Sequence, residues 1–191
     1  MPVNTRTCLI PLLLTIFLII NPSFASTHDA LDSQQASIEK NKALSRQSLG
    51  MWSSHNTIKP ENVFVTNYVN HQIPSLDGKV AAENVKQWKE LVSVYHDSFS
   101  KSNVKILLQV AEKEFVTTYW QITATQSKEY LGVSPTGKSI AWSGVEIDRF
   151  ENNKIAESWV IWDMYSMFTQ LGVIKSPQSL KTLSGKPNKP N

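Results

Sequence analysis

The sequence has 191 residues, a single cysteine at position 8 and a formal net charge of +3. One cysteine excludes a core stabilised by internal disulfides and a zinc site built on several thiolates. The sequence contains no glycine-rich phosphate loop and no nucleophile elbow, the motifs that indicate P-loop nucleotide enzymes and α/β-hydrolases.

The first 25 residues have the three parts of a secretory signal peptide. Arg6 lies in a short polar segment, an apolar run follows over residues 9–20, and Ser23 and Ala25 occupy the −3 and −1 positions of a cleavage site. The apolar run is too short for a helix that crosses a hydrocarbon core of about 30 Å. We therefore expect cleavage after Ala25, no stable membrane anchor afterwards, and a secreted or periplasmic protein. Cleavage would remove Cys8, which excludes thiol catalysis.

The segment after the signal peptide predicts a polar leader and then helices. Residues 26–36 are typical of a flexible leader, and residues 37–52 have apolar side chains at roughly helical spacing. Pro60 favours the start of a helix that continues over 63–69, although the β-branched residues there leave a strand open. Residues 79–99 have the clearest helical pattern, with a broad apolar stripe opposite charged side chains.

After position 103 the pattern changes from helix to strand. Segments rich in Val, Ile, Thr, Tyr and Trp predict strands at residues 104–112, 115–125, 139–150 and 154–163. Two of the three links are short enough for hairpin turns, so we expect a mainly antiparallel sheet with its strands in chain order. Residues 164–171 predict a final helix. Helices followed by such a sheet indicate an α+β domain over 37–174, with the helices on one face of a curved sheet.

The C-terminal segment, residues 175–191, has four lysines, three prolines, no aromatic residue and no acid. This composition predicts a disordered tail. It has neither the arginines nor the aromatic side chains of a nucleic-acid-binding surface, so we expect no nucleic-acid partner.

Three segments carry a combination of residues that is more specific than any one of them. They are YVNHQIP at 68–74, SPTGKSIAWSGVEIDRFENNKIAESW at 134–159, and Asp163 followed by Gln-Leu-Gly at 170–172. In this order and spacing they resemble the SnoaL-like polyketide cyclase, or ester cyclase, family of the NTF2-like superfamily. The resemblance covers about residues 40–174, which is most of the chain that remains after cleavage.

The resemblance implies a fold and a chemistry. The family fold is a cone, in which N-terminal helices pack against a strongly curved, mainly antiparallel sheet that encloses a pocket. Family cyclases close a ring by intramolecular aldol condensation, with an Asp as general acid/base and with no metal or organic cofactor. The resemblance thus implies a cofactor-free cyclase or isomerase-type enzyme acting on a small, apolar carbonyl compound of polyketide or ester type.

Asp163 and His71 are the candidate catalytic residues. A carboxylate at a strand end in a poorly hydrated pocket has a raised pKa, which suits proton transfer near neutral pH. The alternative for Asp163 is the N-cap of the final helix, and one carboxylate can fill both roles. His71 stands where the family motif has its histidine and would orient a carbonyl or pair with Asp163; the alternative is a surface turn residue.

Aromatic and acidic side chains supply the candidate pocket wall. Period-2 alternation puts Glu157 and Trp159 on the same strand face as Asp163. We expect Glu146 to point inward, with Arg149 on the opposite face of its strand as an ion-pair partner of Glu157 or Glu151. The candidate substrate-binding residues are Tyr95, Trp120, Trp142, Glu146, Glu157 and Trp159. Ordinary core packing is the alternative for at least half of the tryptophans.

Two further functions stay open at this point. One is a pocket that binds or carries a small hydrophobic molecule outside the cytoplasm without catalysis. The other is an interaction module that forms a homodimer through the open face of the sheet. The spacing of histidines and acids supports no metal site. Because one fold can host enzymes and binders alike, the site has to decide between them.

Overall fold

The computed structural model describes residues 22–72 and 80–175. The chain divides into a first unit that ends at Gln35 and a second that begins at Ala36. Residues 1–21 of the expected signal peptide and residues 176–191 of the expected tail lie outside the described residues. Within the described part of the chain, no helix is long and apolar enough to cross a membrane.

The segment expected to be a flexible leader is helical. Helix α1 runs over Pro22–Gly50 and includes residues 26–36. The side chains of residues 28–37 are all exposed. Helix α1 contains four alanines, three glutamines and three leucines, and no glycine or proline occurs between Pro22 and Gly50. Residues that favour the helix thus form one here, although residues 26–36 have no apolar stripe. The absence of a stripe indicates only that this segment has no apolar face to pack, and not that it is a flexible leader.

The other helices of the second unit are short. Pro60 starts a single 3-10 turn, η1 (Pro60–Asn62), after which the chain becomes strand β1 (Phe64–Gln72). Strand, the alternative favoured by the β-branched residues, is therefore the correct one. Helix α2 (Val85–Ser98) begins after Asn84, whose side chain accepts a hydrogen bond from the Gln87 amide at 3.0 Å. Helix α3 covers Met164–Leu171, as the sequence predicts.

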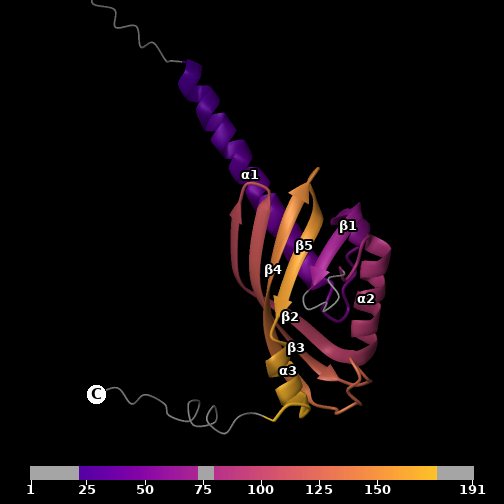
Figure 1. Cartoon of the computed structure of the whole chain (residues 1–191). Coiled ribbons are helices and arrows are strands. Elements are labelled where there is room, and N and C mark those ends of the chain that lie inside the picture. The colour runs from indigo at the N-terminus through magenta and orange to yellow at the C-terminus, as the bar shows by residue number, and fades with distance from the viewer. Residues whose placement is uncertain (1–21, 73–79, 176–191) are drawn as a thin grey trace, which may run out of the picture. The chain divides into compact units, whose positions relative to one another are not determined.

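The sheet has five strands in the order β1-β5-β4-β3-β2 (Figure 1). Strands β2 (Phe99–Glu112), β3 (Phe115–Gln126), β4 (Ser139–Glu151) and β5 (Lys154–Trp162) are the four predicted ones. Each pairs antiparallel with the next, which confirms the expected meander. Strand β1 adds a parallel pair at the β5 edge, so the curved sheet is mixed. The predicted α+β architecture is confirmed.

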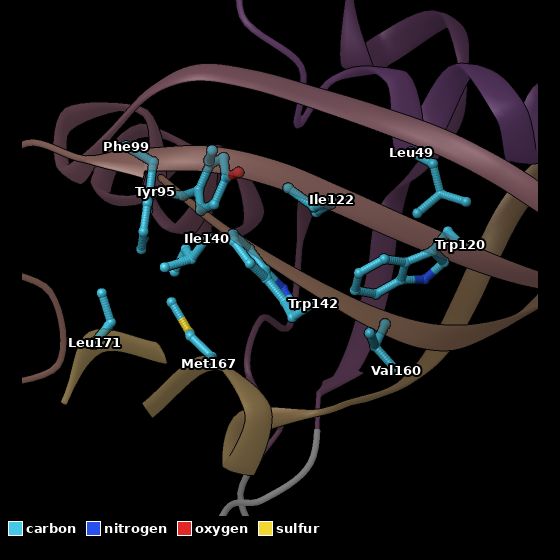
Figure 2. Close-up of a cluster of buried hydrophobic side chains, with 11 residues drawn as sticks. Leu49, Tyr95, Phe99, Trp120, Ile122, Ile140, Trp142, Val160, Met167 and Leu171 are labelled. Atoms are coloured by element: carbon cyan, nitrogen blue, oxygen red, sulfur yellow. The ribbon is translucent and has the colours of Figure 1, made fainter. Parts of the chain in front are cut away.

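Two hydrophobic clusters fill the second unit. One lies between α2 and β1 around Phe64, Tyr68 and Trp88. The other lies between the inner face of the sheet and the helices and is drawn in Figure 2. Its labelled members are Leu49, Tyr95, Phe99, Trp120, Ile122, Ile140, Trp142, Val160, Met167 and Leu171. This second cluster surrounds the candidate site.

Residues of the family-like segments fasten α3 to the sheet. The Gln170 side chain donates to the Ala141 carbonyl at 2.6 Å and accepts from the Ala141 amide at 3.0 Å. The Lys138 ammonium donates to the carbonyls of Gln170 and Leu171, each at 3.1 Å. Gly172 then ends the helix with a φ of 91°, a left-handed conformation that glycine adopts readily. These residues fix the helix that carries Met167 into the core.

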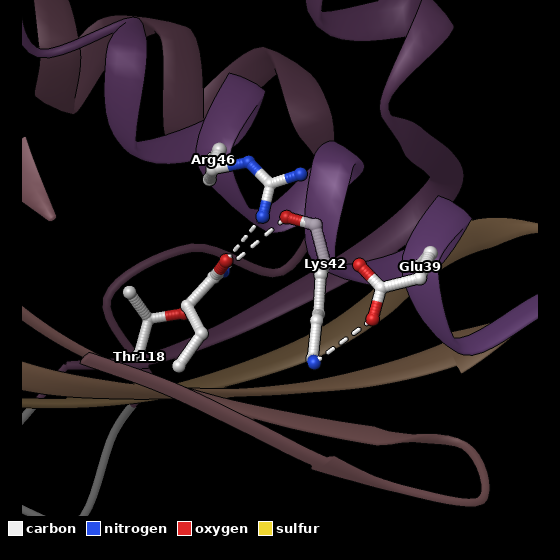
Figure 3. A network of polar contacts seen from close by, with 5 residues as sticks. Glu39, Lys42, Arg46 and Thr118 are labelled. Atoms are coloured by element: carbon white, nitrogen blue, oxygen red, sulfur yellow. Dashed lines mark hydrogen bonds and ion pairs between the residues drawn. The ribbon is translucent and has the colours of Figure 1, made fainter. Parts of the chain in front are cut away.

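Gln109 fastens the end of α1 to the sheet through contacts with Lys42, Arg46 and Thr118, which are labelled in Figure 3. Its side-chain amide donates to the Lys42 carbonyl at 3.2 Å and to the Thr118 hydroxyl at 3.0 Å. Its oxygen accepts from Arg46 at 2.6 Å. Because Gln109 is on β2 and Thr118 is on β3, the last turns of α1 are held over these strands. This position brings Ser48 of α1 to the carboxyl group of Glu146.

Candidate active site

A cavity of about 40 Å³ lies between the sheet and helices α1, α2 and α3. Six aromatic side chains line it: Trp52, Tyr95, Trp120, Tyr130, Trp142 and Trp162. Its polar wall residues are Asn70, Gln72 and Glu146. The cavity is therefore small and aromatic. Glu146 is the one carboxyl group that the described residues contribute to its wall.

The sheet register arranges the inner side chains of β3, β4 and β5 in rows. Residues directly opposite one another give the rows Trp120–Gly144–Trp162, Thr118–Glu146–Val160 and Val116–Asp148–Ser158. Successive inner residues of one strand are about 6.6–6.8 Å apart. Glu146 thus lies in the middle row, between the two tryptophans on one side and Asp148 on the other.

Glu146 and Asp148 form a buried pair of carboxyl groups. Glu146 is 4 % exposed and Asp148 is 0 % exposed. The Ser48 hydroxyl makes a long contact of 3.4 Å with Glu146 Oε1, and the Ser158 hydroxyl donates to Asp148 Oδ1 at 2.5 Å. No basic side chain described by the structure makes an ion pair with either carboxyl group. The pair is thus held by hydroxyl groups alone.

This environment keeps a proton on Glu146. Burial, and next the charge of Asp148, raise the pKa of Glu146 well above its ordinary value. Burial also raises the pKa of Asp148, while the hydrogen bond from Ser158 acts in the opposite direction. Two carboxyl groups so close share their protons. Of the two carboxyl groups, Glu146 is the one that belongs to the cavity wall.

The two tyrosines of the wall hold their protons firmly. The Ser102 hydroxyl donates to the Trp52 carbonyl at 2.7 Å, so the Tyr95 hydroxyl is the donor in its 2.6 Å contact with Ser102. Burial raises the pKa of Tyr95 above its ordinary value and that of Tyr130 to about 12. Neither hydroxyl therefore exchanges a proton readily near neutral pH, and Glu146 is the titrating group of this wall.

The comparison with protein-family models shows which family the chain belongs to. The family model for SnoaL-like polyketide cyclases matches residues 42–171. The chain belongs to the SnoaL-like polyketide cyclase family. The resemblance stated from the sequence segments is thereby confirmed. No curated protein matches the chain.

Solved structures similar to this SnoaL-like chain share its fold. AclR, a candidate hydroxylase from Streptomyces galilaeus, is 22% identical with a TM-score of 0.65, covering 77% of this chain and 90% of its own. A candidate polyketide cyclase from Acidithiobacillus ferrooxidans is 26% identical with a TM-score of 0.61, covering 70% and 94%. IdmH, a candidate polyketide cyclase from Streptomyces antibioticus, is 21% identical with a TM-score of 0.59, covering 70% and 99%. The likeness confirms an NTF2-like α+β fold.

The SnoaL-like cavity contains four of the predicted binding residues. Tyr95, Trp120, Trp142 and Glu146 all line it, and Glu146 points inward as expected. These four come from α2, β3 and β4, and only the tertiary fold brings them together.

The other two predicted binding residues, Glu157 and Trp159, lie on the outer face of β5, next to His71 of β1. The rings of His71 and Trp159 stack with their centroids 5.1 Å apart. Arg149 Nε donates to Glu157 Oε2 at 3.1 Å, and His71 Nε2 lies 3.9 Å from Glu157 Oε1. The predicted ion pair between Arg149 and Glu157 is therefore confirmed, and it belongs to the outer face of the sheet.

Asp163 is exposed and caps α3. Its Oδ1 accepts a hydrogen bond from the Ser166 amide at 2.8 Å, and the carboxylate is not part of the cavity wall. The structure thus shows the capping role that the sequence left open. A catalytic role for Asp163 stays a prediction, and so does one for His71.

Sequence reasoning missed Trp162 and Asp148. Trp162 lies in the cavity wall, because Val160 and Trp162 occupy the inner face of β5. A signal for this was present: an outward Arg149 that pairs with Glu157 puts the Glu157 face of β5 outside and the Trp162 face inside. Strand alternation puts Asp148 on the same face of β4 as Glu146, but its pairing with Ser158 depends on the strand register.

Proposed function

We propose that this SnoaL-like protein is a cofactor-free acid/base enzyme of the cyclase or isomerase type, with Glu146 as its general acid/base. The observation that carries the proposal is the position of Glu146. It is the one carboxyl group among the described residues of the cavity wall, and a second buried carboxyl group lies in the next row. Titrating groups with raised pKa values in apolar cavities are typical of acid/base sites.

In the proposed reaction, Glu146 transfers one proton from a substrate carbon to a substrate oxygen. As a carboxylate, Glu146 takes a proton from the carbon next to a substrate carbonyl, which leaves an enolate. The enolate carbon then forms a bond to a second carbonyl carbon of the same molecule. The resulting alkoxide takes the proton from Glu146, which regenerates the carboxylate. The raised pKa makes Glu146 a stronger base than an ordinary carboxylate and matches its acid form to neutral pH.

Asp148 is a positioning residue in this scheme. It lies outside the cavity wall and does not reach the substrate. Its charge helps to raise the pKa of Glu146, and Ser158 holds its carboxylate in place at 2.5 Å. Removing that charge should move the pKa of Glu146 toward its ordinary value.

The size of the cavity limits the substrate. Pockets for drug-sized ligands measure about 300–1,000 Å³, whereas this cavity measures about 40 Å³. A small flat carbonyl compound is thus a better candidate than an extended polyketide chain. The aromatic wall suits such a ring, since faces and edges of tryptophan stack on flat apolar molecules.

A model ketone tests the proposal. Exchange of the α-hydrogens of 1-indanone with deuterium from D₂O can be followed by proton NMR. We expect the wild-type protein to accelerate this exchange and Glu146→Gln to lower the protein-dependent rate about 10²–10⁴-fold, the usual contribution of a general base. Asp163→Asn, which alters a carboxylate outside the cavity wall, is the matched control and should leave the rate within about twofold.

Three results would contradict the proposal. Equal exchange rates for the wild type and Glu146→Gln would show that another group carries out the proton transfer. Binding of 1-indanone without exchange would favour the alternative of a non-catalytic carrier. Loss of exchange in Asp163→Asn alone would return the general-base role to Asp163.

We further propose that the protein acts outside the cytoplasm. Arg6, the apolar run over 9–20 and the small residues Ser23 and Ala25 support a signal peptide. The expected result is an N-terminus at Ser26 in protein isolated from the periplasm or medium, measured by mass spectrometry. An intact N-terminus on cytoplasmic protein would contradict it.

A further inference from the structure

Two indole groups of the cavity wall have unused hydrogen-bond donors. Trp120 on β3 and Trp162 on β5 both line the cavity. The Nε1–H group of each is buried and has no hydrogen-bond partner among the residues that the structure describes. A buried donor without a partner is unfavourable, so native structures nearly always supply an acceptor.

The two indoles stand out among the tryptophans of the chain. All six tryptophans lie within the described residues, and only Trp120 and Trp162 carry a buried N–H group without a partner there. Both belong to the same cross-strand row, with Gly144 between them. Two unpaired donors in one row of one cavity indicate a common acceptor.

Gly144 allows this arrangement. A β-carbon at this position would lie 2.4 Å from Cζ2 of Trp120 and 2.7 Å from the Ile161 carbonyl oxygen. The Trp120 ring therefore lies over the β4 backbone, in the space that any side chain at position 144 would fill. Trp120 is thus brought across β4 toward the strand that carries Trp162.

We propose that Trp120 and Trp162 donate hydrogen bonds to one oxygen atom of the ligand, and that this oxygen belongs to a carbonyl group. The inference rests on the proposed function in one respect. It assigns the row of Trp120 and Trp162 to bind the carbonyl oxygen of the substrate from which Glu146 takes a proton. A neutral carbonyl oxygen is a better acceptor here than a charged group, because the wall around the indoles is aromatic and aliphatic.

The distances along the sheet fit this assignment. Glu146 is the next inner residue after Gly144, about 6.6–6.8 Å along the strand. A carbonyl oxygen held at the indole row therefore places the neighbouring carbon toward Glu146. As Glu146 removes a proton from that carbon, negative charge develops on the oxygen. Two fixed N–H donors stabilise this charge, as an oxyanion hole does.

The ketone 1-indanone and its parent hydrocarbon indane form a matched pair of probes. They have nearly the same size and shape, and only the ketone carries an acceptor. In ¹⁵N–¹H spectra of the unaltered protein, we expect 1-indanone to shift the indole N–H resonances of Trp120 and Trp162 to lower field. Indane should not produce this shift. The resonances of Trp88 and Trp159, outside the cavity wall, serve as internal references.

Affinity measurements complete the test. We expect 1-indanone to bind about 3- to 10-fold more tightly than indane, the ratio that one net hydrogen bond gives. Trp120→Phe and Trp162→Phe should each reduce this preference and leave indane affinity within about twofold. Trp159→Phe, on the outer face, is the matched control for loss of an indole. The spectra of the unaltered chain keep the test valid if a variant fails to fold.

The outcomes separate this inference from the proposed function. Equal affinities for the two probes, shifts confined to other tryptophans, or no binding of either probe would overturn the indole assignment. Loss of exchange in Glu146→Gln with no ketone preference would uphold the base and reject the indoles. Persistent exchange in Glu146→Gln with the indole shifts intact would do the reverse.

Discussion

The two faces of the sheet carry similar residues in opposite electrostatic settings. On the outer face, Glu157 lies beside Trp159 and accepts a hydrogen bond from Arg149 at 3.1 Å. On the inner face, Glu146 lies next to the Trp120–Trp162 row, and its described hydrogen-bond partner is the Ser48 hydroxyl. A carboxyl group near tryptophan is common to both faces, so it does not identify the site.

The counter-charge separates the two faces. The Glu157 side chain keeps 29 % of its surface exposed and forms an ion pair with the guanidinium group of Arg149. Glu146 is 4 % exposed and lies next to a second acid, so its pKa is raised by burial and then by Asp148. The inner carboxyl group therefore favours its protonated form, whereas the outer one lies beside a guanidinium group.

The largest expected effect is a pH dependence of stability that belongs to the inner face. The pKa values of Glu146 and Asp148 are both raised from their ordinary values of 4.5 and 3.8. Their contribution to stability is therefore complete at pH below those ordinary values and is lost as pH rises through the raised values. The free energy of unfolding should fall from about pH 5 upward, by at most about 1.4 kcal/mol per pH unit for each proton.

Urea unfolding at several pH values measures this slope. Asp148→Asn should flatten it, because the asparagine removes one of the two acids and can still accept the Ser158 hydrogen bond. Glu157→Gln, the matched change on the outer face, should leave the slope as it is. The comparison between the faces breaks down if both variants change the slope equally.

Gly144→Ala should have the next largest effect. The added β-carbon meets the Trp120 ring at 2.4 Å and the Ile161 carbonyl at 2.7 Å, so the ring or the strand must move. Overpacking of this kind typically lowers the free energy of unfolding by about 1–3 kcal/mol. Thermal unfolding measures the loss, and the indole resonance of Trp120 reports the displaced ring. Ser143→Ala, one residue earlier on the other face, is the control and should change neither reading.

The smallest effect is expected from the outer ion pair. Arg149→Gln removes the partner of Glu157 and Glu151 at a site where the side chains are about one third exposed, 30 % for Arg149 and 29 % for Glu157. A loss of about 0.2–1 kcal/mol is expected, and it should shrink further in high salt. Denaturant unfolding at low and high salt measures it. A larger, salt-independent loss would mean that the outer cluster is as critical to the fold as the inner one.

Much of the fold could be predicted because its signals are local. The four strands from β2 to β5, helix α3 and the cap at Asp163 follow from side-chain period and turn chemistry over a few residues. The inward Glu146 and the ion pair of Arg149 with Glu157 follow from strand alternation together with charge. These predictions needed no knowledge of which distant segments meet.

The features that were missed depend on long-range pairing. The parallel contact of β1 with β5 joins segments about ninety positions apart, such as Asn70 and Ser158, and no local period encodes it. Which face of β5 is inner depends on the side that α1 and α3 cover. That choice decides whether Trp159 or Trp162 enters the cavity, and Glu157 and Trp159 were therefore expected on the wrong side.

The hydrogen bonds that hold α3 to the sheet bear on how members of this family are recognised from their sequences. Lys138 and Gln170 lie in two of the segments that resemble the family. Their side chains form hydrogen bonds with backbone atoms of α3 and of β4. Part of the resemblance thus lies in residues that hold α3 to the sheet and not in the cavity wall. Two proteins can share these contacts between α3 and the sheet while they differ at Glu146 and Trp162. Sorting SnoaL-like sequences by their reactions therefore calls for comparing the inner rows of β3, β4 and β5.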